Sequence, residues 1–170
     1  FADKVIEEGG LQKCAAFAAR EHGDARRALD LLRVAGELAE RESSPKLTLA
    51  FIDRAKDKIE KDKMIDIIEN EPRQHQLVLY SILDLHKEDT ETIVTGNVYN
   101  KYQEYCLKTK NDILTQRRVS DIIAEFDMLG LINVHVVSRG RQGRTREIKL
   151  MLPELIRIRA KEIISSALTL

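Results

Sequence analysis

Arginine side chains crowd into one short segment in the last third of the chain. Residues 138–146 contain four arginines and two glycines but no acidic residue. Guanidinium groups donate paired hydrogen bonds to phosphate oxygens, and glycine lets a backbone turn sharply. We therefore expect this segment to contact a nucleic-acid backbone or enter a minor groove; the alternative is an exposed hairpin that its charges merely keep soluble. The candidate residues are Arg139, Gly140, Arg141, Gln142, Arg144, Thr145 and Arg146.

A second basic group opens the helix that is predicted over residues 116–129. Thr115 stands in the N-cap position and Gly130 in the position of a left-handed stop. Between them, apolar residues recur at spacings of three and four, at Val119, Ile122, Ile123, Phe126 and Leu129. Arg117 points away from this stripe, which suits a base edge, whereas Arg118 on its flank suits a phosphate. The candidate residues of this helix are Gln116, Arg117, Arg118 and Ser120; the alternative is an ordinary charged surface helix.

Two predicted strands hold the basic segment. Apolar and polar residues alternate after Gly130 and again before Pro153, the pattern of half-buried strands. The apolar positions are Ile132, Val134, Val136, Ile148, Leu150 and Leu152. An exposed helix start beside a basic hairpin is the layout of a winged helix-turn-helix that binds DNA. The competing class is a module that docks on a partner protein.

The remaining segments are predicted to be helical. A helix over residues 24–41, capped by Asp24, would bury the stripe Ala25, Ala28, Leu29, Leu32, Ala35 and Leu38. Further helices are expected from about 73 to 86, from a cap at Thr95, and after Pro153. The last of these would bury Leu155, Ile158, Ile163 and Leu168.

The stripe that starts at Leu49 slips out of phase near residues 61–63. Because neither glycine nor proline interrupts it, the slip indicates a change of packing partner, with a separate helix ending near Glu71. We therefore predict a mostly α fold with a small antiparallel β-hairpin, divided into domains over residues 1–62 and 63–170.

Charge and composition narrow the class of protein. The formal net charge is zero, but residues 1–71 hold 13 basic against 16 acidic residues, a charge of −3. Residues 72–152 hold 12 against 10, a charge of +2. Cys14 and Cys106 lie in apolar helical patterns and are expected to be buried, reduced thiols. No histidine or cysteine spacing predicts a metal site, and no catalytic constellation is found.

Two further stretches carry a family resemblance. Residues 23–33, Gly-Asp-Ala-Arg-Arg-Ala-Leu-Asp-Leu-Leu-Arg, resemble the sensor-2 helix of AAA+ ATPases. This sequence is similar to that of archaeal replication initiators related to the largest subunit of the origin recognition complex and to the helicase loader. Residues 95–99, 115–123, 129–132 and 138–141 resemble the winged-helix domain of the same family. Gln142 departs from it, because relatives often carry an aromatic residue there.

The resemblance implies a helical AAA+ lid followed by a winged helix-turn-helix domain. It implies sequence-specific binding of double-stranded DNA at replication origins, with the replicative helicase and other initiator copies as protein partners. The alternative is a module that recruits those proteins. It also implies that Arg26, or Arg27 next to it, senses nucleotide phosphates, against the plainer alternative of a solvated ion pair between Arg26 and Asp30.

The same resemblance sets expectations for the full-length parent. The chain has no Gly-x-x-x-x-Gly-Lys-Ser/Thr loop and opens on Phe1 directly into a helical pattern, so we expect the C-terminal part of a longer protein. We expect no enzyme activity or cofactor in this chain, but an AAA+ ATPase using ATP or ADP with magnesium in the parent. The expected location is the cytoplasm, at the nucleoid, and reduced thiols suit such a reducing compartment. No apolar run of membrane-spanning length is present.

Overall fold

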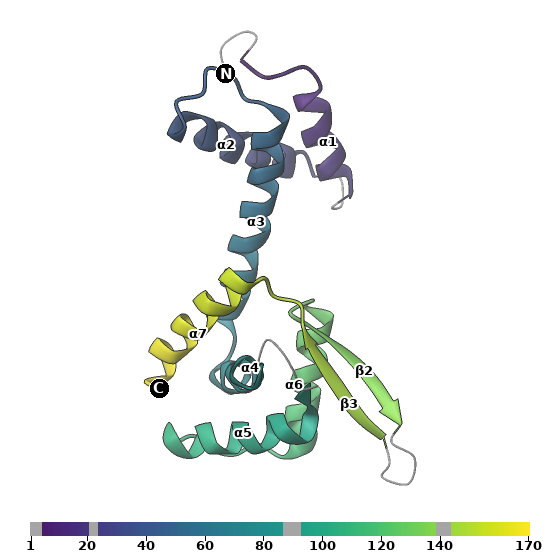
Figure 1. Ribbon diagram of the computed structural model, residues 1–170, viewed down its shortest axis with the longest axis vertical. Helices are drawn as coiled ribbons and strands as arrows, with labels where there is room; N and C mark the ends of the chain where they lie inside the picture. Colours follow the sequence, from purple (N-terminus) through teal and green to yellow (C-terminus); the bar gives the residue numbers. More distant parts are fainter. Residues whose placement is uncertain (1–4, 21–23, 87–92, 139–143) are drawn as a thin grey trace. The chain divides into compact units, whose positions relative to one another are not determined.

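The protein divides into two compact units, residues 1–63 and 64–170, each described here by itself. The computed structural model describes residues 5–20, 24–86, 93–138 and 144–170 (Figure 1). The fold is mostly α with a small antiparallel sheet, as predicted. The predicted domain bounds, 1–62 and 63–170, stay a prediction. No helix within the described ranges is long and apolar enough to cross a membrane.

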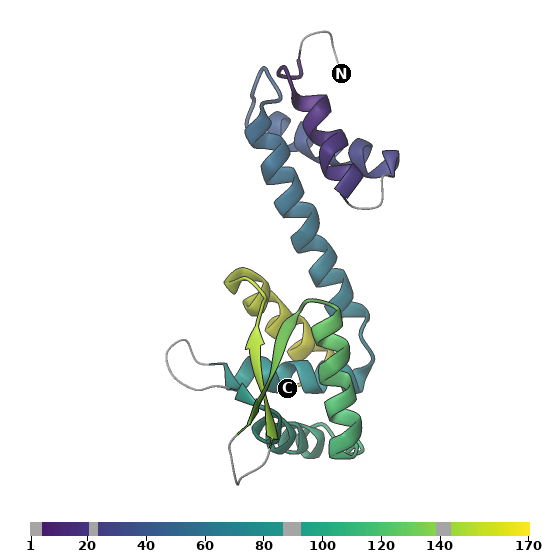
Figure 2. The ribbon, with the colours of Figure 1, turned by 90° about the vertical axis from the view of Figure 1, so that its right-hand side faces the viewer.

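The first unit contains α1 (Gly10–Arg20), α2 (Ala25–Arg41) and the beginning of α3 (Leu49–Asn70). Figure 2 shows α1 and α2, the two purple helices, side by side. The predicted cap of α2 is confirmed, because Asp24 Oδ1 accepts a hydrogen bond from the backbone N–H of Arg26 at 2.9 Å. The core joins three helices and the segment before α3, and consists of Cys14, Leu31, Leu32, Val34, Ala35, Ala39, Leu47, Phe51, Ile52 and Ala55.

The predicted stripe of α2 was only partly wrong. Leu32 and Ala35 are buried, and Ala28 and Leu38 are partly buried against the core, as predicted. Leu29 is 67% exposed and Ala25 is also exposed, whereas Leu31 and Val34 are buried. Leucine occurs on several faces of this helix, so the pattern alone allowed two stripes. Packing against α1 and α3 selects the face of Leu31, about 160° away from Leu29 at 100° per residue.

α3 is a single helix across the predicted phase slip, so the separate helix expected to end near Glu71 does not exist. Its early apolar residues, among them Phe51 and Ile59, pack in the first cluster. From Met64 to Ile68 its apolar residues pack in a second cluster. The slip therefore marks a change of packing partner without a break in the helix.

The second unit contains α4 (Arg73–Leu85), β1 (Ile93–Val94), α5 (Thr95–Lys108), α6 (Gln116–Met128), β2 (Ile132–Ser138), β3 (Arg144–Leu150) and α7 (Glu154–Leu168). Its sheet has the order β1-β3-β2, all antiparallel. β1 extends the predicted hairpin by a strand of two residues, with Ile93 opposite Ile148. Thr95 is the first residue of α5 and not its cap, because Val94 occupies the N-cap position without a side-chain hydrogen bond.

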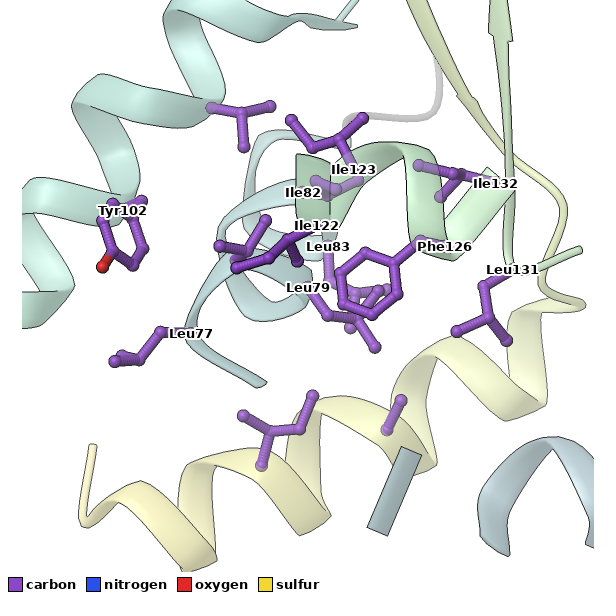
Figure 3. Packing of buried hydrophobic residues seen from close by; sticks show 14 of the residues in the cluster. Leu77, Leu79, Ile82, Leu83, Tyr102, Ile122, Ile123, Phe126, Leu131 and Ile132 are labelled. Atoms are coloured by element: carbon purple, nitrogen blue, oxygen red, sulfur yellow. The ribbon is translucent and has the colours of Figure 1, made fainter. Parts of the chain in front are cut away.

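The core of the second unit is built around α4, which lies between α5 and α7 (Figure 1). Figure 3 shows Leu79 and Ile82 of α4 grouped with Ile122 and Phe126 of α6, and all four are fully buried. Cys106 belongs to this core, and Cys14 to the first one; burial raises the pKa of both thiols, as expected of reduced structural cysteines.

The predicted stripe of α7 was partly wrong. Leu168 is buried, but Leu155 is 70% and Ile158 50% exposed. The buried positions are Ile156, Ala160, Ile164 and Leu168, which are spaced by four residues and face α4. Ala160 is fully buried on this face although its side chain is small, so the choice of face could not be predicted from hydrophobicity alone.

Candidate nucleic-acid interface

α6 is held with one face in the core and its first turn exposed. Thr115 caps it as predicted, its Oγ1 accepting a hydrogen bond from the Arg118 backbone N–H at 3.3 Å. Gly130 ends it with a φ of +71°, the predicted left-handed stop. Leu129 was assigned wrongly to the stripe: it is the C-cap residue and 46% exposed. The four other stripe residues are buried, at Val119, Ile122, Ile123 and Phe126.

A tyrosine fixes the segment that leads into α6. The Tyr102 hydroxyl accepts a hydrogen bond from the Leu114 backbone N–H at 3.0 Å and donates to Gln74 Oε1 of α4. Tyr99 donates to the Leu114 carbonyl at 3.2 Å. Burial is the main cause that raises the Tyr102 pKa, so the phenol stays protonated. Tyr99 and Tyr102 of α5 thus pack in the second unit and position the start of α6.

The paired strands of the hairpin extend further than predicted, because regular pairing continues to the pair Ser138 and Arg144. β2 runs antiparallel to α6, so the C-terminal end of β2 and the N-terminal end of β3 lie towards the end of the unit where α6 begins (Figures 1 and 2). One hydrogen bond ties the two elements: Asp127 Oδ1 of α6 accepts from the Val134 backbone N–H at 3.0 Å. Val136 is 64% exposed, so the predicted apolar stripe of β2 does not extend that far.

Only some of the predicted hairpin residues lie in the part of the chain that the structure describes. Arg146 is exposed and Thr145 half-buried, opposite Val136 and Val137. Arg144 begins β3. The remaining candidates, Arg139, Gly140, Arg141 and Gln142, lie outside the described residues.

The arginines of α6 differ in their partners. Arg117 is exposed, and like Arg146 it forms no ion pair within the part of the chain that the structure describes. Arg118 donates to Glu125 Oε1 at 3.1 Å, while Glu125 Oε2 lies 2.9 Å from Nε2 of His75. The hydrogen bond with His75 is the main cause that lowers the Glu125 pKa, and Arg118 adds to it. Gln116 is exposed and Ser120 half-buried on the same turn.

Sequence reasoning missed Glu125 and His75. The spacing of seven between Arg118 and Glu125 places them on one face, two turns apart, and could have indicated the pair. The contact with His75 spans 50 residues of sequence and had no local signal.

The predicted nucleotide sensor lies in the other unit. Arg26 is exposed in the first turn of α2. The alternative ion pair between Arg26 and Asp30 is not seen. Asp30 Oδ1 instead lies 3.7 Å from Nη2 of Arg33, and Nη1 of Arg33 pairs with Glu37 Oε1 at 2.6 Å. Arg27 is half-buried beside Phe17 and Lys56. Among the described residues, no group of three His, Cys, Asp or Glu side chains could hold a metal ion.

Comparison with protein families decides where the chain belongs. The family described as "CDC6, C terminal winged helix domain" matches residues 66–160, more than half of the chain, and "Cdc6 AAA+ ATPase-type lid domain" matches residues 1–57. The chain belongs to the Cdc6 family. The lid and winged helix of this Cdc6-family chain thus follow one another in the order that the sequence motifs predicted.

Relatives and solved structures agree with this assignment. The chain is 52% identical over 153 residues to ORC1-type DNA replication protein 7 of Halobacterium salinarum, and 53% identical over 150 residues to the ORC1-type DNA replication protein of Pyrococcus abyssi. These matches cover 90% and 88% of the chain but only 30% and 36% of the relatives. The chain therefore spans about a third of their length.

A solved structure of the Aeropyrum pernix ORC1 protein in complex with DNA resembles the chain with a TM-score of 0.80 and 42% identity. The match covers 98% of this chain and 42% of that one. A structure of Drosophila ORC bound to DNA has a TM-score of 0.52 at 21% identity, which supports the fold alone.

Proposed function

We propose that this chain binds double-stranded DNA at replication origins with sequence specificity, through α6 and the β2–β3 hairpin. The observation that carries the proposal is that the exposed start of α6, with Arg117, lies towards the same end of the unit as the C-terminal end of β2 and the N-terminal part of β3, with the exposed Arg146 (Figure 2). The names of the ORC1-type replication relatives and the DNA in the Aeropyrum pernix complex support it.

Each element has a distinct task in this proposal. α6 enters the major groove with its first turn, where Arg117 reads a base edge and Gln116 and Ser120 assist. The hairpin follows the backbone into the neighbouring minor groove, where Arg146 and the other predicted hairpin residues contact phosphates or a narrow A·T tract. Arg118 binds a phosphate beside the helix.

The salt dependence of binding tests the phosphate contacts. If about five phosphates are engaged, the slope of log affinity against log salt is about −4.5, and affinity falls about 500-fold between 50 and 200 mM salt. The measurement is fluorescence anisotropy of labelled origin duplex against a random duplex of equal length. Equal affinity for the two duplexes, or no salt slope, contradicts the proposal.

The first unit acts as an AAA+ lid in a longer protein that binds ATP or ADP with magnesium. In that setting Arg26 contacts the nucleotide phosphates and reports the bound state to the winged helix. The Arg26→Ala variant of a full-length protein should hydrolyse ATP more slowly while this chain alone keeps its DNA affinity. Unchanged hydrolysis would remove the sensor role. Such a protein works at the nucleoid in the cytoplasm.

A second candidate function is recruitment of proteins, such as the replicative helicase or further initiator copies. Leu155 and Ile158 favour it, since these apolar side chains are 70% and 50% exposed on α7. Replacing both with Ser should abolish co-purification of such a partner without changing DNA affinity. Retention of the partner by the double variant would count against this candidate.

A further inference from the structure

One carboxylate of α6 bridges a candidate DNA-binding arginine to the core of the second unit. Glu125 uses both oxygens: Oε1 accepts from Arg118 Nη1 at 3.1 Å, and Oε2 lies 2.9 Å from Nε2 of His75. Seven residues rise about 10.5 Å along a helix. The Arg118 side chain therefore lies along α6 towards its C-terminal end, and does not project beyond the helix start.

His75 makes the far end of this bridge rigid. The residue is 9% exposed on α4, and its ring lies nearly perpendicular to that of Phe126 with centroids 6.1 Å apart. Its Nδ1 is buried and has no hydrogen-bond partner within the described ranges. An ionised carboxylate can only accept hydrogen bonds, so Nε2 of His75 is the donor to Glu125. This hydrogen bond from a buried ring holds Glu125 in one place.

The exposed part of the bridge is poorly suited to stabilise the fold. The side chains of Arg118 and Glu125 are 48% and 38% exposed, and ion pairs at such positions contribute little. Its effect on the arginine is larger, because a free Arg samples many rotamers and loses that freedom when it binds. Glu125 occupies one of the five donor hydrogens of the guanidinium, which leaves the others for a phosphate.

Glu125 also disfavours duplexes whose backbone reaches Arg118 in a different position. Its carboxylate repels any phosphate that approaches the side of the guanidinium already paired with Glu125. A positioned arginine with a negative neighbour thus binds one backbone arrangement well and others poorly.

We propose that Glu125, anchored by His75, is a positioning residue that orients Arg118 for one phosphate of the origin duplex and so increases discrimination against other DNA. This inference rests on the proposed DNA-binding function. Glu125 need not touch DNA itself, since it acts through Arg118.

A pair of isosteric variants separates positioning from simple charge. Glu125→Gln and Asp121→Asn each remove one negative charge from the exposed surface of α6, and Asp121 forms no ion pair or hydrogen bond within the described part of the chain. Charge alone predicts that both variants bind every duplex more tightly. Positioning predicts that Glu125→Gln lowers the ratio of origin to random affinity about 5-fold or more, while Asp121→Asn leaves it within about 2-fold.

A double-mutant cycle supplies a readout that a structural role would not give. In the Arg118→Ala background, Glu125→Gln should have no further effect on the affinity ratio, because the residue to be positioned is gone. Thermal unfolding of each variant controls for the fold.

The outcomes distinguish this inference from the function on which it rests. If the unaltered chain binds origin and random duplexes equally, the proposed function fails, and the inference with it. If it discriminates, but Glu125→Gln and Asp121→Asn change the ratio equally, the function stands and the positioning role is refuted. A loss of ratio in Glu125→Gln that persists in the Arg118→Ala background also refutes it.

Discussion

Removing one hydroxyl group from α5 should destabilise the second unit measurably. In Tyr102→Phe, the Leu114 backbone N–H loses its acceptor and Gln74 Oε1 loses its donor, while the ring still fills the core. A buried polar group left without a partner costs about 1–3 kcal/mol. Since both groups lose a partner at a part-buried site, we expect about 2 kcal/mol in total. For a unit of about this size that corresponds to roughly 8–12 °C in unfolding temperature.

The assay is urea unfolding followed by circular dichroism, with Tyr99→Phe as the matched control. Tyr99 is half-buried, and its hydroxyl donates to the Leu114 carbonyl at 3.2 Å, which water can replace. The control should therefore lose less than about 1 kcal/mol. Equal losses in the two variants, or a loss below about 0.5 kcal/mol in Tyr102→Phe, would show that this hydroxyl does not hold the segment before α6.

Three further predictions concern the interface and the stability of the second unit. Arg117→Ala should reduce sequence discrimination by about 1–3 kcal/mol, whereas Arg146→Ala should weaken binding to all duplexes and reduce the salt slope by about 0.9; anisotropy titrations over a salt series distinguish these results, and the reverse pattern would exchange the two roles. Gly130→Ala should cost about 1–2 kcal/mol, because a φ of +71° strains any residue with a Cβ while no neighbour lies within 4 Å of it; chemical unfolding that shows no loss would contradict this. Burial raises the pKa of Asp84, but hydrogen bonds, first from Tyr105, outweigh it and the pKa lies below its ordinary value. The ionised group therefore stabilises the fold above about pH 4 and loses this effect as the pH falls through its lower folded-state pKa. The difference in stability between the protein and Asp84→Asn, at most about 1 kcal/mol for this half-exposed group, should therefore shrink between about pH 5 and 2. A difference that does not change with pH would refute this prediction.

Sequence predicted those features that neighbouring residues determine. Thr115 and Gly130 mark the ends of α6 because a cap and a left-handed stop are local events, and both are confirmed. The buried face of α6 was also predicted nearly in full, since its polar and apolar residues separate cleanly by face.

Features that depend on distant residues were missed or misassigned. Leu29 and Leu155 belong to helices with more than one apolar face, so only the packing of other helices decides which face is buried. β1 has two residues and forms because Ile93 pairs with Ile148 of β3. The contact between Glu125 and His75 joins α6 to α4 across 50 residues of sequence, so no local pattern could have indicated it.

The hydrogen bond between Asp127 and Val134 has a consequence for how copies of this chain avoid one another. β2 is one of the two edge strands of its sheet, because it pairs only with β3. Outer strands offer unpaired amides on which a foreign strand can add and start aggregation. Asp127 occupies the amide of Val134 at 3.0 Å, so an incoming strand would have to displace a charged group before it could begin to pair there.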